Sequence, residues 1–298
     1  MCHLVSFLVF FQGEHHVTKL GLNALTILAV AEYTHATRHV QYLETATSIA
    51  AWVASCQKED GSFVQRVGEP ENALHKDYYV RYYQGEATFG LARLYNVVKA
   101  LGDNSNNVNN NDRQERESWL KVAKLSADCI VDRDSNLDDS ELSLDHWFMY
   151  GIAELRSHDK NHVDHCIRMI EVVSSRQVQE SSQDMEKDQL GIFGGSTSGT
   201  ATATKTEGMC AVYNMFATTN PEIAATILET TTLAVRFQLQ LQFRPETAMY
   251  MPDPLRILGG FHSSLTNFDM RNDYTLHNLA SFLCMARLLK EQEVAWNQ

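Results

Sequence analysis

The sequence predicts an all-α fold, an α/α toroid of about five helical hairpins with an inner and an outer ring of helices. Three observations lead to this prediction. Wholly apolar helices alternate with amphipathic helices, which implies two layers because only a helix with a polar face can border water. A polar group opens each apolar helix. The openings, at Gly21, Glu86, Asp145, Glu207 and Asp273, lie 59–66 residues apart, a spacing that suits a repeated two-helix unit.

The first hairpin shows the alternation most clearly. Residues from Lys19 to Thr34 are almost all apolar or small, so we expect a helix buried on every side. Apolar residues then recur every three or four positions from Tyr42 to Cys56, as in an amphipathic helix. The pair Asp60-Gly61 that follows is a turn signal, and Phe63 can fold back onto both helices.

The later hairpins repeat this pattern. The expected inner helices are Glu86–Val98, a helix opening at Asp145-His146-Trp147, Glu207–Phe216, and Leu279–Leu289 after Arg271. The expected outer helices are Trp119–Ile130, Val163–Val173 and Pro221–Leu241. Glycine-to-phenylalanine turns are expected again at Gly191–Phe193 and Gly259–Phe261. Loops are expected at Asp103–Asp112, Gln179–Gln189 and Thr197–Thr206, the last as a flexible loop entering the funnel of the toroid.

The first sixteen residues form a separate apolar segment, ahead of a toroid domain at residues 17–298. Its apolar run, Leu4 to Phe11, is too short for a membrane span, which needs ~20 residues. It lacks the basic start and the cleavage site of a signal peptide. A strand, or the end of a truncated element, is the better interpretation, and no stable membrane span is expected.

Composition limits the function further. The chain has 298 residues and a net charge of −12, and it has no basic stripe. Nucleic-acid binding is therefore not expected, because neutralising phosphates requires clustered Lys and Arg. The six cysteines are scattered without a CxxC pair, which favours a reducing, cytoplasmic location. The histidines show no HExxH or facial-triad spacing, so we predict no metal and no cofactor.

Two stretches resemble known families. The segment Gln57–Phe63 resembles the Gln-x-x-x-Gly-x-aromatic motif of α/α-toroid terpenoid cyclases and prenyltransferases, and the turns of six-hairpin glycosidases, sugar epimerases and polysaccharide lyases. The segment Arg271–Tyr274, followed by His277, resembles a stretch near the end of glucuronyl C5-epimerases. The chain departs from terpenoid cyclases, because the nearest acid motif is only Asp138-Asp139, and from prenyltransferases, because no Cys has the neighbours of their zinc site. The resemblance therefore implies a carbohydrate-active enzyme, with five inner helices rather than six and one hairpin lacking upstream.

Acidic residues at the helix openings are the candidate catalytic groups. In a toroid these openings line one rim, and hydrolysis of a glycosidic bond needs two facing carboxyl groups. Each acid can equally be explained as a helix cap that complements the helix dipole. Asp273 and His277, four residues apart, share a helix face and can transfer a proton or form a buried structural network. The predicted catalytic residues are Glu86, Asp145, Glu207, Asp273 and His277.

Aromatic and basic residues beside the acids are candidate substrate ligands. Aromatic faces stack on sugar rings, although core packing explains them too. The predicted substrate-binding residues are Tyr83, His146, Trp147, His262, Arg271 and Tyr274. The leading hypothesis is a glycoside hydrolase, or a sugar epimerase or lyase, acting on a saccharide in a central acidic cleft. The alternative is a non-catalytic helical toroid that serves as a protein-interaction scaffold.

Overall fold

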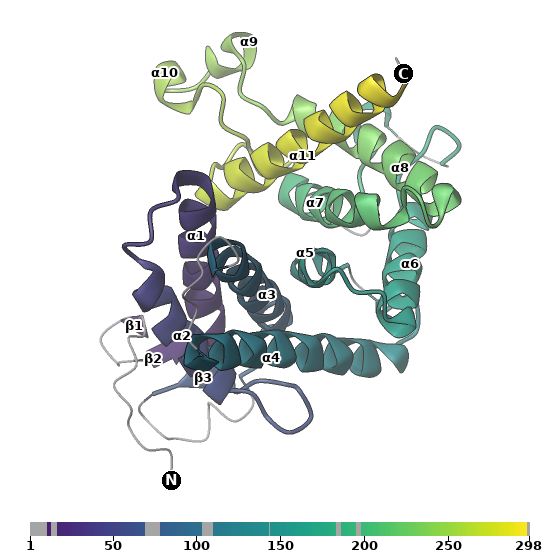
Figure 1. The fold of residues 1–298 in the computed structure, drawn as a ribbon. Coiled ribbons are helices and arrows are strands. Elements are labelled where there is room, and N and C mark those ends of the chain that lie inside the picture. Colours follow the sequence, from purple (N-terminus) through teal and green to yellow (C-terminus); the bar gives the residue numbers. More distant parts are fainter. Residues whose placement is uncertain are drawn as a thin grey trace. The chain divides into compact units, whose positions relative to one another are not determined.

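The computed structural model describes residues 11–12, 17–68, 78–102, 110–142, 144–182, 186–194 and 198–296 (Figure 1). The predicted all-α class is confirmed for these residues, which are mostly helical with three short strands. The helices are α1 (Leu20–Thr37), α2 (Leu43–Ser55), α3 (Tyr83–Gly102), α4 (Asn110–Ser135), α5 (His146–Leu155), α6 (Lys160–Ser175), α7 (Gly199–Phe216), α8 (Pro221–Gln240), α9 (Pro245–Ala248), α10 (Pro254–Ile257) and α11 (Asn272–Trp296), with a 3-10 turn η2 (Lys187–Gln189). None of the helices in the described part is long and apolar enough to cross a bilayer.

The three strands form one small antiparallel sheet in the order β1 (Phe11–Gln12), β2 (Val17–Lys19) and β3 (Arg66–Val67). Thr18 of β2 pairs with Phe11 on one side and with Val67 on the other. Of the expected N-terminal strand only Phe11 lies within the described residues. The sheet holds the start of α1 to the segment after α2, because Leu20 also donates its backbone N–H to the carbonyl of Gln65.

The chain divides into two compact units. Unit 1 comprises Met1–Asp138 and Trp147–His165, and unit 2 comprises Asp139–His146 and Cys166–Gln298. In unit 1, α3 packs against α1 and α4, and α1 also packs against α2. Small residues permit the close approach of α1 and α3, since a Cβ on Gly90 would lie 2.8 Å from the carbonyl oxygen of Ala24.

The expectation that the first helix is buried on every side is wrong. Leu22 and Leu25 of α1 are each 37% exposed, whereas Ala24 and Ile27 are fully buried. The main packing partners of α1 are α2 and α3, and their contacts leave Leu22 and Leu25 partly exposed. Apolar composition therefore overstated its burial.

In unit 2, α7 packs against α8 and α11. A buried amide ties these three helices together: Gln238 of α8 donates to the hydroxyl of Thr206 at 3.0 Å and accepts from the hydroxyl of Ser281 at 2.6 Å. Thr206 belongs to α7 and Ser281 to α11. All three side chains are fully buried, so this network fixes how α7 and α11 are aligned along one another.

Turns of one design follow helices α2, α6 and α8, which the sequence predicts as amphipathic. In each turn a glutamine just after the helix forms an isolated β-bridge with a phenylalanine, and its side-chain amide donates to the carbonyl of a glycine. The three sets are Gln57/Gly61/Phe63, Gln177/Gly191/Phe193 and Gln242/Gly259/Phe261. The glycines have φ between 84° and 95°, a conformation that glycine adopts at no steric cost. The three expected glycine-to-phenylalanine turns are thus present, and they support a repeated hairpin.

The predicted loop Thr197–Thr206 is wrong from Gly199 onward, because α7 begins there. The Ser198 side chain accepts from the backbone N–H of Ala201 and caps the helix. Hydroxyls that were expected to disfavour a helix are satisfied inside it, since Thr206 donates to the carbonyl of Thr202. Glu207 therefore lies in the middle of α7 and not at its opening. The Asn-rich loop also ends earlier than expected, at the start of α4 at Asn110, while its residues 103–109 lie outside the described part.

Candidate functional site

Three side chains of unit 2 meet in a cluster formed by His146, Glu207 and His277. Nδ1 of His277 lies 2.8 Å from Oε1 of Glu207, in hydrogen-bonding contact. The His146 ring stands edge-on to the His277 ring, with centroids 5.4 Å apart. One ligand-capable atom from each residue lies within 4.8 Å of the other two. We call this group the His–Glu–His cluster.

Each member is held by a regular helix. His146 is the first residue of α5, Glu207 lies in the middle of α7, and His277 lies in the second turn of α11. The Gln238 network lies next to the cluster, because Thr206 precedes Glu207 and Ser281 is one turn beyond His277. The positions of the carboxylate and of the His277 imidazole are therefore set by packed helices rather than by loops.

The cluster is largely removed from water. Glu207 is 3% exposed and His146 is 9% exposed, whereas the His277 side chain keeps 14% of its surface. Burial, together with the neighbouring His277, lowers the pKa of His146 to about 3. The His146 imidazole is therefore neutral at pH 7. His277 thus has the most exposed side chain of the three.

A pair of thiols lies on α7 and α11, the helices that carry Glu207 and His277. The Cys210 thiol of α7 donates to the sulfur of Cys284 in α11, which raises the pKa of Cys210 and lowers the pKa of Cys284. Arg287 also donates to the Cys284 sulfur at 3.6 Å. The negative charge of Glu207 acts on Cys284 in the opposite direction and raises the pKa of this thiol. The thiol pair is therefore electrostatically coupled to Glu207 of the cluster.

Three predicted residues at the start of α11 form a more exposed patch. The Arg271 guanidinium pairs with the Asp273 carboxylate at 3.0 Å, and it also lies over the Tyr274 ring, 5.3 Å from its centroid. The Arg271 side chain is 66% exposed and that of Asp273 is 36% exposed. These residues lie about one helical turn from His277 but contribute no atom to the cluster.

Two further predicted residues of unit 2 are buried. Asp145 directly precedes His146 and is 8% exposed, although its side chain is not part of the cluster. His262 is directed into its own turn, where a ring nitrogen lies 2.7 Å from the carbonyl oxygen of Ser264. Its ring packs against Phe243 and Phe268. The contacts of His262 are thus those of a residue that holds its turn together, and its predicted role in binding substrate stays a prediction.

Three other predicted site residues belong to unit 1: Glu86, Tyr83 and Trp147. Glu86 is 5% exposed and lies against Gly21 of α1, where a Cβ would collide with its carboxylate. The Tyr83 hydroxyl is 3.4 Å from that of Tyr78, and burial raises the pKa of Tyr83, as does this hydrogen bond. Trp147 packs in an aromatic group with Phe89 and Tyr150, its ring tilted against both.

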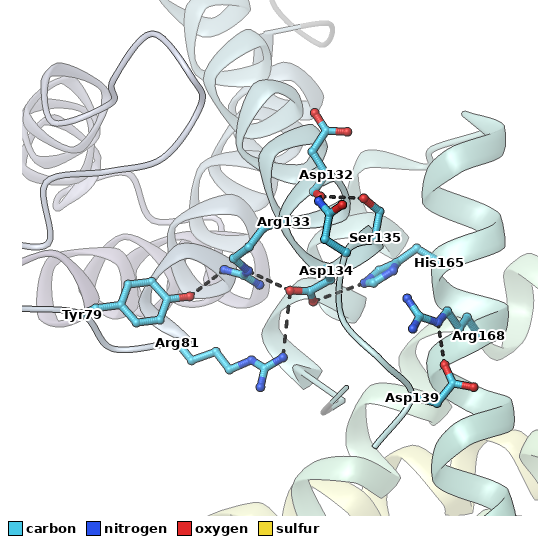
Figure 2. Close-up of polar contacts among 10 residues, drawn as sticks. Tyr79, Arg81, Asp132, Arg133, Asp134, Ser135, Asp139, His165 and Arg168 are labelled. Carbon is cyan, nitrogen blue, oxygen red and sulfur yellow. Dashed lines mark hydrogen bonds and ion pairs between the residues drawn. The ribbon is translucent and has the colours of Figure 1, made fainter. Parts of the chain in front are cut away.

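A second charged cluster, in unit 1, surrounds Asp134 (Figure 2). Asp134 lies at the end of α4 and is 2% exposed. Its carboxylate lies 2.7 Å from Arg133, 3.6 Å from His165 and 4.0 Å from Arg81, and Arg133 also donates to the Tyr79 hydroxyl (Figure 2). Burial alone would raise the pKa of Asp134, but hydrogen bonds and positive charge from His165 and Arg133 lower it to about 2. This carboxylate stays ionised and anchors neighbouring segments.

The structure therefore brings together two of the predicted catalytic residues, Glu207 and His277, with His146, which was predicted to bind substrate. The missed feature is that these three form one ligand-capable group. A search for short metal-binding spacings cannot find it, because the residues lie 61 and 70 positions apart along the chain. The sequence did carry one signal of the cluster, the regular spacing of the polar positions that open the helices expected to be inner. Comparison of the chain with protein-family models, curated proteins and solved structures gives no match.

Proposed function

We propose that the protein is a carbohydrate-active enzyme whose reactive centre is the His–Glu–His cluster, and that its reaction moves a proton at a substrate carbon, as in a sugar epimerase or lyase. One observation carries the proposal: the 2.8 Å contact between Glu207 and His277, with His146 beside it, in a nearly dry environment. A carboxylate bonded to an imidazole is a common acid–base pair. Low dielectric strengthens its action on developing charge.

Proton transfer at carbon fits this cluster better than glycoside hydrolysis does. A glycosidase of the common type needs two carboxyl groups on opposite sides of the scissile bond. The cluster offers one carboxylate and two imidazoles, and the hydrogen-bonded pair of Glu207 and His277 can act as base and acid. An epimerase or lyase needs a base for a C–H group and an acid for the return or leaving step, which this combination can provide.

The patch at the start of α11 supports an acidic sugar as substrate. Arg271 is exposed and close in the chain to His277, and a guanidinium binds a carboxylate through two parallel hydrogen bonds. The ring of Tyr274 lies beside Arg271 and offers a face on which a sugar ring can stack. The resemblance of Arg271–Tyr274 and His277 to glucuronyl C5-epimerases points the same way. We therefore propose a uronic-acid-containing saccharide as the substrate.

For the fold, we propose that the hairpins continue one another around an α/α toroid of about five hairpins. The repeated glutamine turns support this. Gln57, after α2, donates to Val122 of α4, and Gln177, after α6, donates to Thr230 of α8. In both cases the acceptor belongs to the next outer helix, which is the contact that propagates a helical-hairpin superhelix. A crystal structure tests whether the superhelix closes into a ring.

The enzymatic proposal is tested with a panel of uronate-containing and neutral oligosaccharides in deuterated water. Deuterium appearing at a substrate carbon reports an epimerase, a new unsaturated product reports a lyase, and new reducing ends report a hydrolase. We expect Glu207→Gln and His277→Gln each to lower turnover by ~10²–10⁴-fold, the usual contribution of a general acid or base. Circular dichroism checks that both variants fold.

A matched control exists in unit 1. His162 and Asp128 form a contact of the same length, 2.8 Å, outside the cluster. His162→Gln should therefore leave turnover unchanged. Full activity in Glu207→Gln and His277→Gln would refute the proposal, and no turnover of any substrate by the wild-type protein would favour the scaffold alternative.

A further inference from the structure

The His–Glu–His cluster combines two imidazoles with one carboxylate. This is the ligand set of a well-known class of catalytic zinc sites, in which three protein ligands leave one position for water or substrate. Here the three ligand-capable atoms already lie within 4.8 Å of one another. We propose that the cluster binds one divalent transition-metal ion, with zinc as the natural occupant. The proposal replaces the expectation, based on sequence spacing alone, that the chain binds no metal.

The distances require only a small adjustment. Zinc binds nitrogen and oxygen ligands at ~2.0–2.2 Å, so tetrahedral ligand atoms lie about 3.4 Å apart. The Nδ1 atom of His277 and the Oε1 atom of Glu207 are 2.8 Å apart and would separate slightly once the ion displaces the proton between them. The widest separation, 4.8 Å, must close by about 1.5 Å, which side-chain rotation provides without moving a helix.

Packing holds two of the ligands in place. Thr206 and Ser281, next to Glu207 and one turn from His277, are both bonded to the buried Gln238. Ligands carried by rigid helices and supported by neighbouring hydrogen bonds define a metal site better than ligands on loops. Burial of Glu207 and His146 shields the site, whereas the exposed edge of His277 leaves a route for the ion and for a substrate.

The ligand types select the metal. Magnesium and calcium prefer sets made only of oxygen, so two imidazoles disfavour them. Two histidines and one carboxylate also suit iron(II), but zinc binds such ligands more tightly in the general order of divalent-metal affinity. The ion deepens the proposed function, and its catalytic role rests on that function: His146, Glu207 and His277 would hold it, and it would supply a bound hydroxide as the base near neutral pH in place of the Glu207–His277 pair. Binding itself does not depend on the reaction.

The test is a zinc titration of the full-length protein after chelator treatment and gel filtration. Affinity is measured in competition with a chromophoric chelator, without any saccharide, and thermal unfolding is followed in parallel. We expect one zinc per chain and a higher Tm, because an ion that binds only the folded state stabilises it. His146→Gln, Glu207→Gln and His277→Gln should each weaken binding by at least about 100-fold, the upper end of what losing an outer-sphere partner costs.

Two controls separate this site from other zinc-binding groups. The double variant Cys210→Ser/Cys284→Ser removes the neighbouring thiol pair, and His162→Gln removes the His162–Asp128 contact of unit 1. Both should bind zinc as tightly as the wild-type protein. The proposal is overturned if the wild-type protein binds no stoichiometric zinc, or if binding is lost in the cysteine variant and kept in Glu207→Gln.

Cobalt(II) keeps the test decisive where a variant does not fold. Bound to the wild-type protein, cobalt reports its ligands through visible and near-ultraviolet absorption. A tetrahedral spectrum without thiolate charge transfer supports the cluster, and strong thiolate charge transfer overturns it. The two proposals fail separately. Zinc binding without turnover of any saccharide refutes only the proposed function, whereas turnover by a protein that binds no zinc refutes only the metal site.

Discussion

Two buried carboxylates show how neighbouring side chains decide what a charged residue does. Asp134 and Glu207 are 2% and 3% exposed. Asp134 faces two arginines, whose charge is permanent, and hydrogen bonds and positive charge from His165 and Arg133 hold its pKa at about 2. Glu207 faces His277, an imidazole that can gain a proton, lose one or bind a metal. The first arrangement fixes a charge for stability, and the second leaves the carboxylate available for chemistry.

The first prediction concerns pH and Asp134. Its pKa is lowered from 3.8 to about 2, so its stabilising contribution is present above pH ~4 and is lost as the pH falls through 2. The shift corresponds to about 2 kcal/mol. We expect Asp134→Asn to lower the free energy of unfolding at pH 7 by at least that amount, and to flatten the loss of stability between pH 4 and 2. Urea unfolding across that range measures both effects.

The matched control for Asp134→Asn is Asp138→Asn, which removes an exposed carboxylate of the following turn. It should change the free energy of unfolding by less than ~0.5 kcal/mol at either pH. Equal stability of Asp134→Asn and the wild-type protein at pH 7 would contradict the anchoring role of the Asp134 cluster.

The second prediction concerns the stability of Glu207 variants. A buried carboxylate costs desolvation free energy that an imidazole returns only partly, and functional residues are often not optimal for stability. Glu207→Gln keeps the shape of the side chain and removes the charge. We therefore expect its Tm, measured by circular dichroism in zinc-free buffer, to equal or exceed that of the wild-type protein. A Tm lower by more than about 5 °C would assign Glu207 a structural role.

At the scale of elements, the glutamine turns after α2, α6 and α8 share one hydrogen-bonding pattern. Gln177 is 4% exposed and donates to two carbonyls, that of Gly191 at 3.1 Å and that of Thr230 at 2.9 Å. The equivalent Gln242 is more exposed and donates to Gly259 at 3.3 Å. The turn after α6 is therefore anchored to α8, whereas the turn after α8 is held mainly by its own glycine.

The third prediction compares these two glutamines. Gln177→Ala leaves two carbonyls without their donor in a buried place and should cost about 2 kcal/mol. Gln242→Ala loses one partly exposed bond and should cost less than ~1 kcal/mol. Chemical denaturation of both variants gives the difference. Equal costs would mean that the bond from Gln177 to Thr230 adds nothing to the stacking of hairpins.

The fourth prediction compares two glycines of these turns. Gly191 and Gly259 share a positive φ, of 95° and 85°. A Cβ on Gly191 would collide with the carbonyl of Leu233 in α8, whereas one on Gly259 would meet no atom within 4 Å. Gly259→Ala should thus cost only backbone strain, ~1 kcal/mol, and Gly191→Ala about 3 kcal/mol, because it adds a steric clash. Denaturation midpoints of the two variants test this ranking.

At the scale of the whole molecule, the chain divides into two compact units that interleave along the sequence. Residues 139–146 leave unit 1 for unit 2, and the chain then returns until His165. His146, the first residue of α5, consequently belongs to the cluster of unit 2, whereas the rings of Trp147 and Tyr150 pack together in unit 1. Because each unit comprises two separate stretches of sequence, cutting the chain at one point does not separate the two units completely.

The fifth prediction uses hydrogen exchange to ask whether the units respond separately. If zinc binds as proposed, it stabilises helices that carry its ligands, and cooperative units show protection as blocks. We expect slower exchange in α7 and α11 when zinc is added, and unchanged exchange in α1 and α3 of unit 1. Mass spectrometry of peptides from the four helices reads this out. Equal protection in all four would show that the described parts unfold as one body.

The sequence by itself determined the helices and the turns between them. Apolar spacing predicted α1 and α2 to within a few residues, because helix periodicity is written in neighbouring positions. The turn at Gly191 was predictable for the same reason, since a glycine and a phenylalanine two residues apart are a local signal. The start of α7 was not, because Ser and Thr favour loops until their hydroxyls find partners within the helix, as Thr206 does with Thr202.

Only the tertiary structure decided which candidate residues meet. Glu207 and His277 were recognisable as separate catalytic candidates and His146 as a candidate substrate ligand, but their contact depends on the packing of α7 against α11 and on the position of His146 in unit 2. The sequence equally suggested Asp145 and Asp273, which the structure leaves outside the cluster. Local patterns specify helices, whereas a site built from residues 61 and 70 positions apart depends on helix alignment, which buried side chains such as Gln238 fix only in the folded chain.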